Sequence, residues 1–299
     1  MFTQYFGNYL LNQGLVTVEQ LRKALDSSVH TRVKLGVHAI NQGYMTAKQV
    51  EEVHKKQMTM DQKFGEIAIS LNYLSQDKVD LMLSMQFSGH LLLGQTLIDM
   101  EVITYESFSE CMLQYKREYS LSDDQFTSIV NGDVDMLVAA LFAKSGQTYV
   151  PWIKDYVTLF AKNLIRFVDS GIRIEIGVKR PESFDWVYSQ IIEKVDLEQI
   201  GITALVGSEA SFLHFATRYA QETVDIPDEM MHSSVGEFLN LHNGLFLVNL
   251  SNQGIELDLM PPLATRDLTI QDSQIILEIR IISDEMTIDL FVTDFTCLM

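Results

Sequence analysis

The sequence has few cysteines, few prolines and little positive charge. Its 299 residues include two Cys and five Pro, and 22 Lys and Arg stand against 40 Asp and Glu, a net charge of −18. The distant Cys111 and Cys297, with no secretion signal before them, indicate reduced thiols and a cytoplasmic protein. Because phosphate backbones require basic surfaces, the charge argues against binding to a nucleic-acid polymer.

Long apolar runs and the common catalytic motifs are also missing. No stretch approaches about eighteen consecutive apolar residues, so we expect no membrane span. The chain has no phosphate-binding loop, no dinucleotide fingerprint and no nucleophile elbow, and its His spacing predicts no metal site. With 47% hydrophobic residues, however, it has enough apolar surface for sizeable cores.

Charge and periodicity divide the chain in two. Residues 1–118 carry 11 basic and 13 acidic side chains, whereas residues 119–299 carry 11 and 27. The first part is rich in Gln and Leu and indicates helices throughout, whereas the second contains the alternating runs of strands. We therefore expect an all-α domain at 1–118, a helical connector at 119–150 and an α+β domain at 151–299.

The N-terminal part is an internal repeat. Four glycines are each separated by 29 residues: Gly7, Gly36, Gly65 and Gly94. In the first two units a second Gly follows seven residues later, where it would end a helix in the left-handed conformation. A capping-box pattern such as Thr46 to Gln49 then starts the next helix. The repeat predicts four helix–turn–helix units that share a core.

The two middle units resemble the tandem motif of the N-terminal domain of type II secretion ATPases, including the MshEN class that binds cyclic di-GMP. They run from Lys34 to Gln57 and from Lys63 to Gln86, with a five-residue spacer. The resemblance implies cyclic di-GMP as a ligand, held by Lys34, Gly36, Gly43, Gln57, Lys63, Gly65 and Gln86. Lys replaces the family's Arg in both units and lacks its planar fork. A helical docking domain whose glycines serve only the fold therefore stays open.

The C-terminal part predicts helices and an antiparallel sheet. We expect a helix at 152–170 closed by Gly171, a shorter helix at 211–221 and a long helix at 228–251. The predicted strands are 172–176, 201–208, about 255–260, 274–283 and 286–293.

One motif stands on the long helix. Ser233, Glu237 and Asn240 follow a [D/S]-x-x-x-E-x-x-N arrangement, and Pro261 and Pro262 come 21 and 22 residues after Asn240. This arrangement, with the order of elements around it, resembles the CheC/CheX/FliY phosphatases of bacterial chemotaxis. The single Glu/Asn pair is most similar to the CheX branch, and the resemblance runs from near Val150 to the end of the chain.

The resemblance implies hydrolysis of the aspartyl phosphate of a CheY-like receiver domain, which supplies its own Mg²⁺, so no intrinsic cofactor is expected. Glu237 and Asn240 are three residues apart and share a helix face. There Asn240 could orient the attacking water, and Glu237 could pair with a lysine of the receiver. Ser233 and the two prolines would contact the partner. A homodimer is implied by the resemblance alone.

A second hypothesis is a non-catalytic signalling adaptor that only docks partners, since a fold does not fix a function. The exposure of Glu237 and Asn240 discriminates between the two. Burial of either side chain in the core would favour the adaptor, whereas exposure of both keeps catalysis open.

Overall fold

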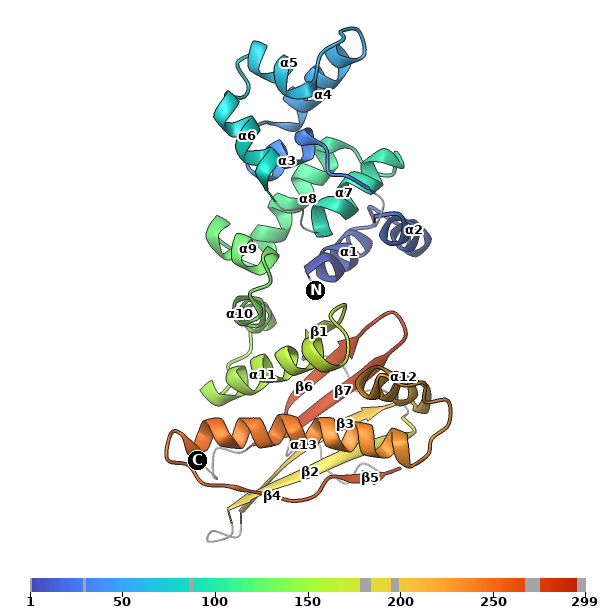
Figure 1. The fold of residues 1–299 in the computed structure, drawn as a ribbon. Coiled ribbons are helices and arrows are strands. Elements are labelled where there is room, and N and C mark those ends of the chain that lie inside the picture. Colours follow the sequence, from blue (N-terminus) through green and yellow to red (C-terminus); the bar gives the residue numbers. More distant parts are fainter. Residues whose placement is uncertain are drawn as a thin grey trace. The chain divides into compact units, whose positions relative to one another are not determined.

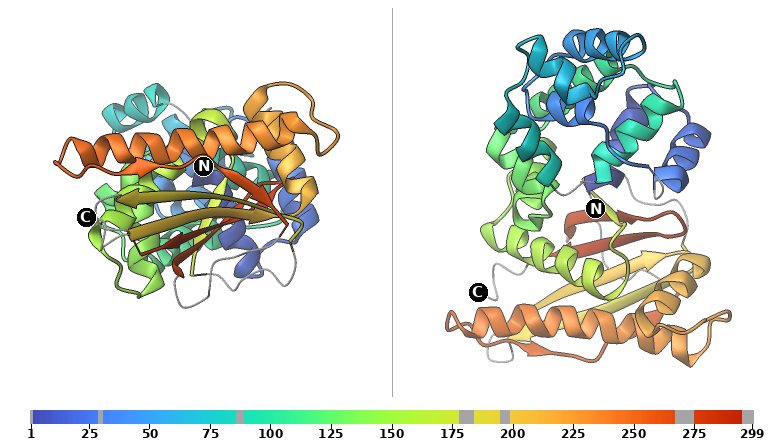
Figure 2. Two further views of the ribbon diagram at one scale, coloured as in Figure 1. Left: turned by 90° about the horizontal axis from the view of Figure 1, so that it is seen from below. Right: turned by 45° about the horizontal axis from the view of Figure 1, so that its top comes forward.

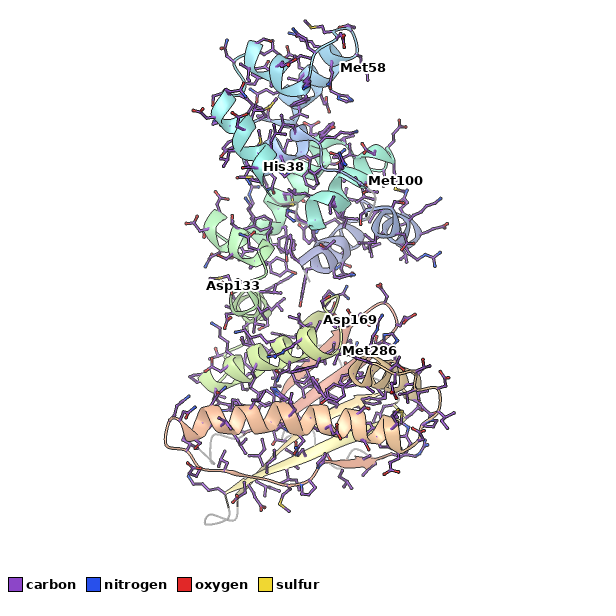
Figure 3. All side chains as sticks on the ribbon, viewed as in Figure 1. His38, Met58, Met100, Asp133, Asp169 and Met286 are labelled. Atoms are coloured by element: carbon purple, nitrogen blue, oxygen red, sulfur yellow. The ribbon has the colours of Figure 1, made fainter. Side chains whose placement is uncertain are left out.

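The computed structural model describes residues 2–28, 31–85, 89–177, 184–194, 199–266 and 275–294. The chain divides into two compact units, Phe2–Asp133 and Val134–Met299. Figure 1 shows the elements of both, and Figure 3 labels Asp133, the last residue of the N-terminal unit. The division falls inside the segment expected as a connector.

The N-terminal unit is helical over its described residues, as the sequence predicts. Its helices are α1 (Phe2–Asn12), α2 (Val18–Ser28), α3 (Leu35–Asn41), α4 (Ala47–Gln57), α5 (Phe64–Ser70), α6 (Gln76–Ser84), α7 (Gly89–Asp99), α8 (Tyr105–Glu118) and α9 (Asp123–Val130). The predicted capping box at α4 is present, because the Thr46 side chain accepts from the Gln49 amide and the Gln49 side chain accepts from the Thr46 amide.

The repeated glycines allow the two helices of each unit to pack closely. A Cβ atom at Gly36 on α3 would lie 2.6 Å from Cγ1 of Val50 on α4, and one at Gly94 on α7 would overlap the Phe108 ring on α8. The contacted residue is 14 positions later in both units. A larger side chain at these positions would separate the paired helices.

The first helix of each unit is followed by a left-handed residue, which the sequence predicts only for the two units that carry the second glycine. Gly14 and Gly43 have φ of 67° and 66°, and Asn72 and Glu101 occupy the equivalent positions at 58° and 57°. The turn geometry therefore persists in the two units that lack the glycine.

Among its described residues the C-terminal unit has four helices: α10 (Val134–Ser145), α11 (Pro151–Phe167), α12 (Glu209–Ala220) and α13 (Glu229–Ser251). Asp228 caps α13 by accepting from the amides of Met230 and Met231. The prediction that α11 extends to Ser170 with Gly171 as its cap is wrong. The helix ends at Phe167 because the carboxylate of Asp169, labelled in Figure 3, accepts from the Gly171 amide and forms a turn instead.

In the part of the chain that the structure describes, the sheet has seven strands: β1 (Arg173–Ile176), β2 (Trp186–Lys194), β3 (Gln199–Gly207), β4 (Asp258–Leu259), β5 (Leu263–Thr265), β6 (Ile275–Ile282) and β7 (Thr287–Thr293). Their order is β1-β6-β7-β3-β2-β4, with β5 also paired to β2, and every pairing is antiparallel. The antiparallel sheet is thus confirmed, although β2 was not predicted. The strand expected at 255–260 is present only at Asp258–Leu259, and Pro261 and Pro262, which carry no N–H, limit it on its C-terminal side.

The long helix α13 lies across one face of the sheet, with α12 packed against it (Figures 1 and 2). On β2, Tyr188 and Gln190 point to this face, where they bond residues of α13. The opposite face carries an apolar cluster of Val187, Ala204, Val206 and Phe291. None of the described helices is long and apolar enough to cross a membrane.

Candidate functional site

The motif residues of α13 lie together at one hollow of the C-terminal unit. Ser233, Glu237 and Asn240 are all exposed, at helical spacings of four and three residues. They line a pocket of about 570 Å³ together with Pro261 and Pro262. The structure therefore brings all five candidate residues to one site and exposes both members of the Glu/Asn pair.

A glycine in the middle of the motif explains how the proline loop reaches the helix. A Cβ atom at Gly236 would lie 3.3 Å from Cγ of Pro262. Without a side chain at that position, the loop after β4 can lie directly against α13. The two prolines thus form one wall of the pocket that Ser233 and Glu237 also line.

The side-chain amide of Asn240 is hydrogen-bonded to a residue of the sheet. Its Oδ1 accepts a 2.7 Å hydrogen bond from Nε2 of Gln190 on β2. The same Nε2 donates to the backbone carbonyl of Met260, 2.8 Å away. Gln190 is only 1% exposed, so both bonds lie in a site shielded from water.

A buried network continues behind Gln190. Nδ2 of Asn243 donates to Oε1 of Gln190 and to Oγ1 of Thr203, each at 2.8 Å. The Tyr156 hydroxyl donates to Oδ1 of Asn243 at 2.8 Å, and burial raises the pKa of Tyr156, which keeps its proton in place. The network joins α11, α13 and two strands behind the exposed Asn240.

Two further side chains line the pocket. The Tyr188 hydroxyl lies 2.7 Å from Nδ1 of His232. Burial, with a smaller contribution from Glu209, raises the pKa of Tyr188, so the hydroxyl stays protonated and can donate to the ring or accept from it.

Sequence reasoning missed Tyr188, His232 and Gln190. The strand that carries two of them was not predicted, although the tract WVYSQIIEK is rich in β-branched and aromatic residues. That composition was the available signal for β2, but it could not show which of its polar residues faces α13.

The N-terminal candidates lie in the repeat. The Lys34 ammonium forms a 2.6 Å ion pair with Asp99, whose carboxylate also accepts from the Gln95 amide. The backbone amide of Lys63 donates to Glu66, and the Gln57 side chain donates to the Gln62 carbonyl. Gln86 lies outside the described residues.

The paired glycines of the two middle units lie where α3 and α5 meet. A Cβ atom at Gly36 would be 3.4 Å from the Phe64 ring, and one at Gly65 would be 3.4 Å from a Leu35 methyl group. Gly43 adopts a left-handed conformation, with φ of 66°, in the turn after α3. These contacts account for the three glycines by packing and turn geometry, without a ligand.

No group of three or more His, Cys, Asp or Glu side chains in the described ranges is arranged to hold a metal ion. The polar groups that line the pocket are the carboxylate of Glu237, the side-chain amide of Asn240, the hydroxyls of Ser233 and Tyr188, and the imidazole of His232.

Comparison with known proteins finds solved chemotaxis proteins over about half of the chain. A CheC-like superfamily protein from Shewanella sp. PV-4 is 18% identical, with a TM-score of 0.41, over 49% of this chain and 98% of that one. CheX from Vibrio vulnificus is 14% identical, with a TM-score of 0.41, and the match covers 48% of this chain and 99% of that one. A chain of the CheX–CheY–BeF3–Mg²⁺ complex from Borrelia burgdorferi is 16% identical, with a TM-score of 0.41, and the match covers 48% of this chain and 98% of that one.

No protein-family model and no curated protein matches the chain. The solved structures to which the chain is similar, over about half of its length, are CheC-like and CheX proteins. None of them supports the resemblance of the N-terminal unit to secretion ATPases, and cyclic di-GMP binding stays a prediction.

Proposed function

We propose that the C-terminal unit removes the phosphoryl group from the aspartyl phosphate of a CheY-like receiver domain. The observation that carries the proposal is the exposure of both Glu237 and Asn240 in one pocket with Ser233 and the Pro261–Pro262 loop. A residue pair that must enter another protein's active site has to project from the surface, and this pair does.

The chemistry requires little beyond positioning. An aspartyl phosphate already carries a good leaving group, and the receiver supplies the Mg²⁺ that neutralises the phosphoryl oxygens, so the phosphatase has to place a water molecule in line with phosphorus. Asn240 suits this role because its amide forms hydrogen bonds without changing charge. The Glu237 carboxylate would pair with a receiver lysine and fix the orientation of docking.

The proposal is tested with a panel of receiver domains phosphorylated by a small phosphodonor. We expect the protein to accelerate loss of the phosphoryl group from at least one receiver. Asn240→Ala should lower that acceleration roughly 100-fold, the usual effect of removing one positioned polar group. Asn249→Ala, an exposed Asn of the same helix outside the pocket, is the matched control and should keep wild-type activity.

Equal decay with and without the protein across the whole panel would refute catalysis. If the receivers still bind under those conditions, the adaptor hypothesis is the one that stands, because docking without turnover is what it predicts.

A further inference from the structure

The hydrogen bonds behind Asn240 allow only one assignment of donors and acceptors. The Met260 carbonyl is an acceptor and has no proton to give. The Gln190 side-chain atom 2.8 Å from it must therefore be the NH₂ group. The same nitrogen lies 2.7 Å from the side chain of Asn240, so the Asn240 atom that accepts its hydrogen bond must be the oxygen Oδ1.

The rest of the network agrees with that assignment. With its NH₂ group committed to Met260 and Asn240, Gln190 has its oxygen left for Asn243, whose NH₂ lies 2.8 Å away. The second proton of that NH₂ goes to Thr203. Reversal of the Gln190 amide would place its oxygen against the Met260 carbonyl, an arrangement of two acceptors that a buried site does not tolerate.

We infer that Gln190 is a positioning residue that fixes the amide of Asn240, with Oδ1 anchored on the sheet and the Nδ2 protons turned outward. The inference rests on the function proposed above. It assigns the outward hydrogen-bond donors of Asn240 to the phosphoryl oxygens or to the oxygen of the attacking water. The fixed amide removes a rotation that would otherwise be lost on each docking event.

Two variants separate the positioning of Asn240 from a general loss of hydrogen bonds in the buried network. Gln190→Glu keeps the shape of the side chain but replaces both donors by a carboxylate oxygen, which favours rotation of the Asn240 amide to present its NH₂ inward. Thr203→Val is the matched control, because it removes a hydrogen bond from the same buried network without touching Gln190 or Asn240.

Turnover kinetics give the first readout. Gln190→Glu should lower kcat on the order of 10- to 100-fold with KM for the phosphorylated receiver within about twofold of wild type. Thr203→Val should retain most of the wild-type kcat. Equal losses in the two variants, or a wild-type kcat in Gln190→Glu, would overturn the positioning role.

Proton exchange gives a second readout that requires no receiver. In wild-type protein the Gln190 NH₂ protons should be protected from solvent exchange, because both are hydrogen-bonded and buried, and the Asn240 NH₂ protons should exchange as those of an exposed amide. In Gln190→Glu the Asn240 protons should become protected. Protected Asn240 protons in wild type would refute the inference even where no receiver is a substrate, whereas inactivity alone would refute only the proposed function.

Discussion

At the scale of single residues, a buried histidine close to the motif makes the stability of the C-terminal unit depend on pH. His242 follows the motif by two residues, is fully buried and receives a 3.3 Å contact from the Asn163 amide at Nδ1. Desolvation lowers the pKa of His242 from 6.5 to about 3. Above pH 6.5 the ring is neutral in both the folded and unfolded states. Below that pH only the unfolded state takes up the proton, so the free energy of unfolding should fall by roughly 1.4 kcal/mol per pH unit.

His242→Phe, which keeps the ring contacts with Tyr156 and Phe160, should remove this dependence. Urea unfolding of the C-terminal unit between pH 4 and 7 compares the two slopes. The variant should be less stable at pH 7, because Asn163 loses a partner, but flatter below pH 6.5. Parallel pH profiles for wild type and variant would contradict the account.

At the scale of elements, the four units of the repeat share one turn geometry although three residue types, Gly, Asn and Glu, occupy the left-handed position. Glu101 adopts a left-handed φ of 57° where the first two units have glycine. A side chain with a Cβ atom is strained in that conformation, so Glu101→Gly should stabilise the N-terminal unit by about 1 kcal/mol. The matched control is Gly43→Ala, which should destabilise it by a similar amount. Urea unfolding measures both, and a less stable Glu101→Gly variant would show that the side chain makes a compensating contact.

The elements also show what the sequence could and could not predict. The helix pairs were predictable because glycine spacing and capping residues such as Thr46 act locally. That Glu237 and Asn240 share one face of a helix was predictable because it needs only helical spacing. The exposure of that face was not predictable, because it depends on what packs against α13. The strand β2 was missed since Gln190 breaks its apolar pattern, and Gln190 is buried only because α13 crosses it. A hydrogen bond between residues 50 positions apart has no signal in the sequence around either one.

At the scale of the whole molecule, the two compact units divide between Asp133 and Val134. All described residues that line the motif pocket lie between Tyr188 and Ala264. A fragment covering residues 134–299 should therefore fold alone and retain the activity of the full chain. Circular dichroism and the dephosphorylation assay check both expectations. A folded fragment without activity would instead assign a catalytic role to residues 2–133.

The account is tested most directly by single-turnover decay of a phosphorylated receiver domain with the full chain in excess. Wild-type protein and Asn249→Ala should accelerate the decay equally, whereas Asn240→Ala should leave it near the spontaneous rate, roughly 100-fold slower. If Asn240→Ala accelerates the decay as much as wild type, the exposed Asn of the motif is not the catalytic residue and the central claim fails.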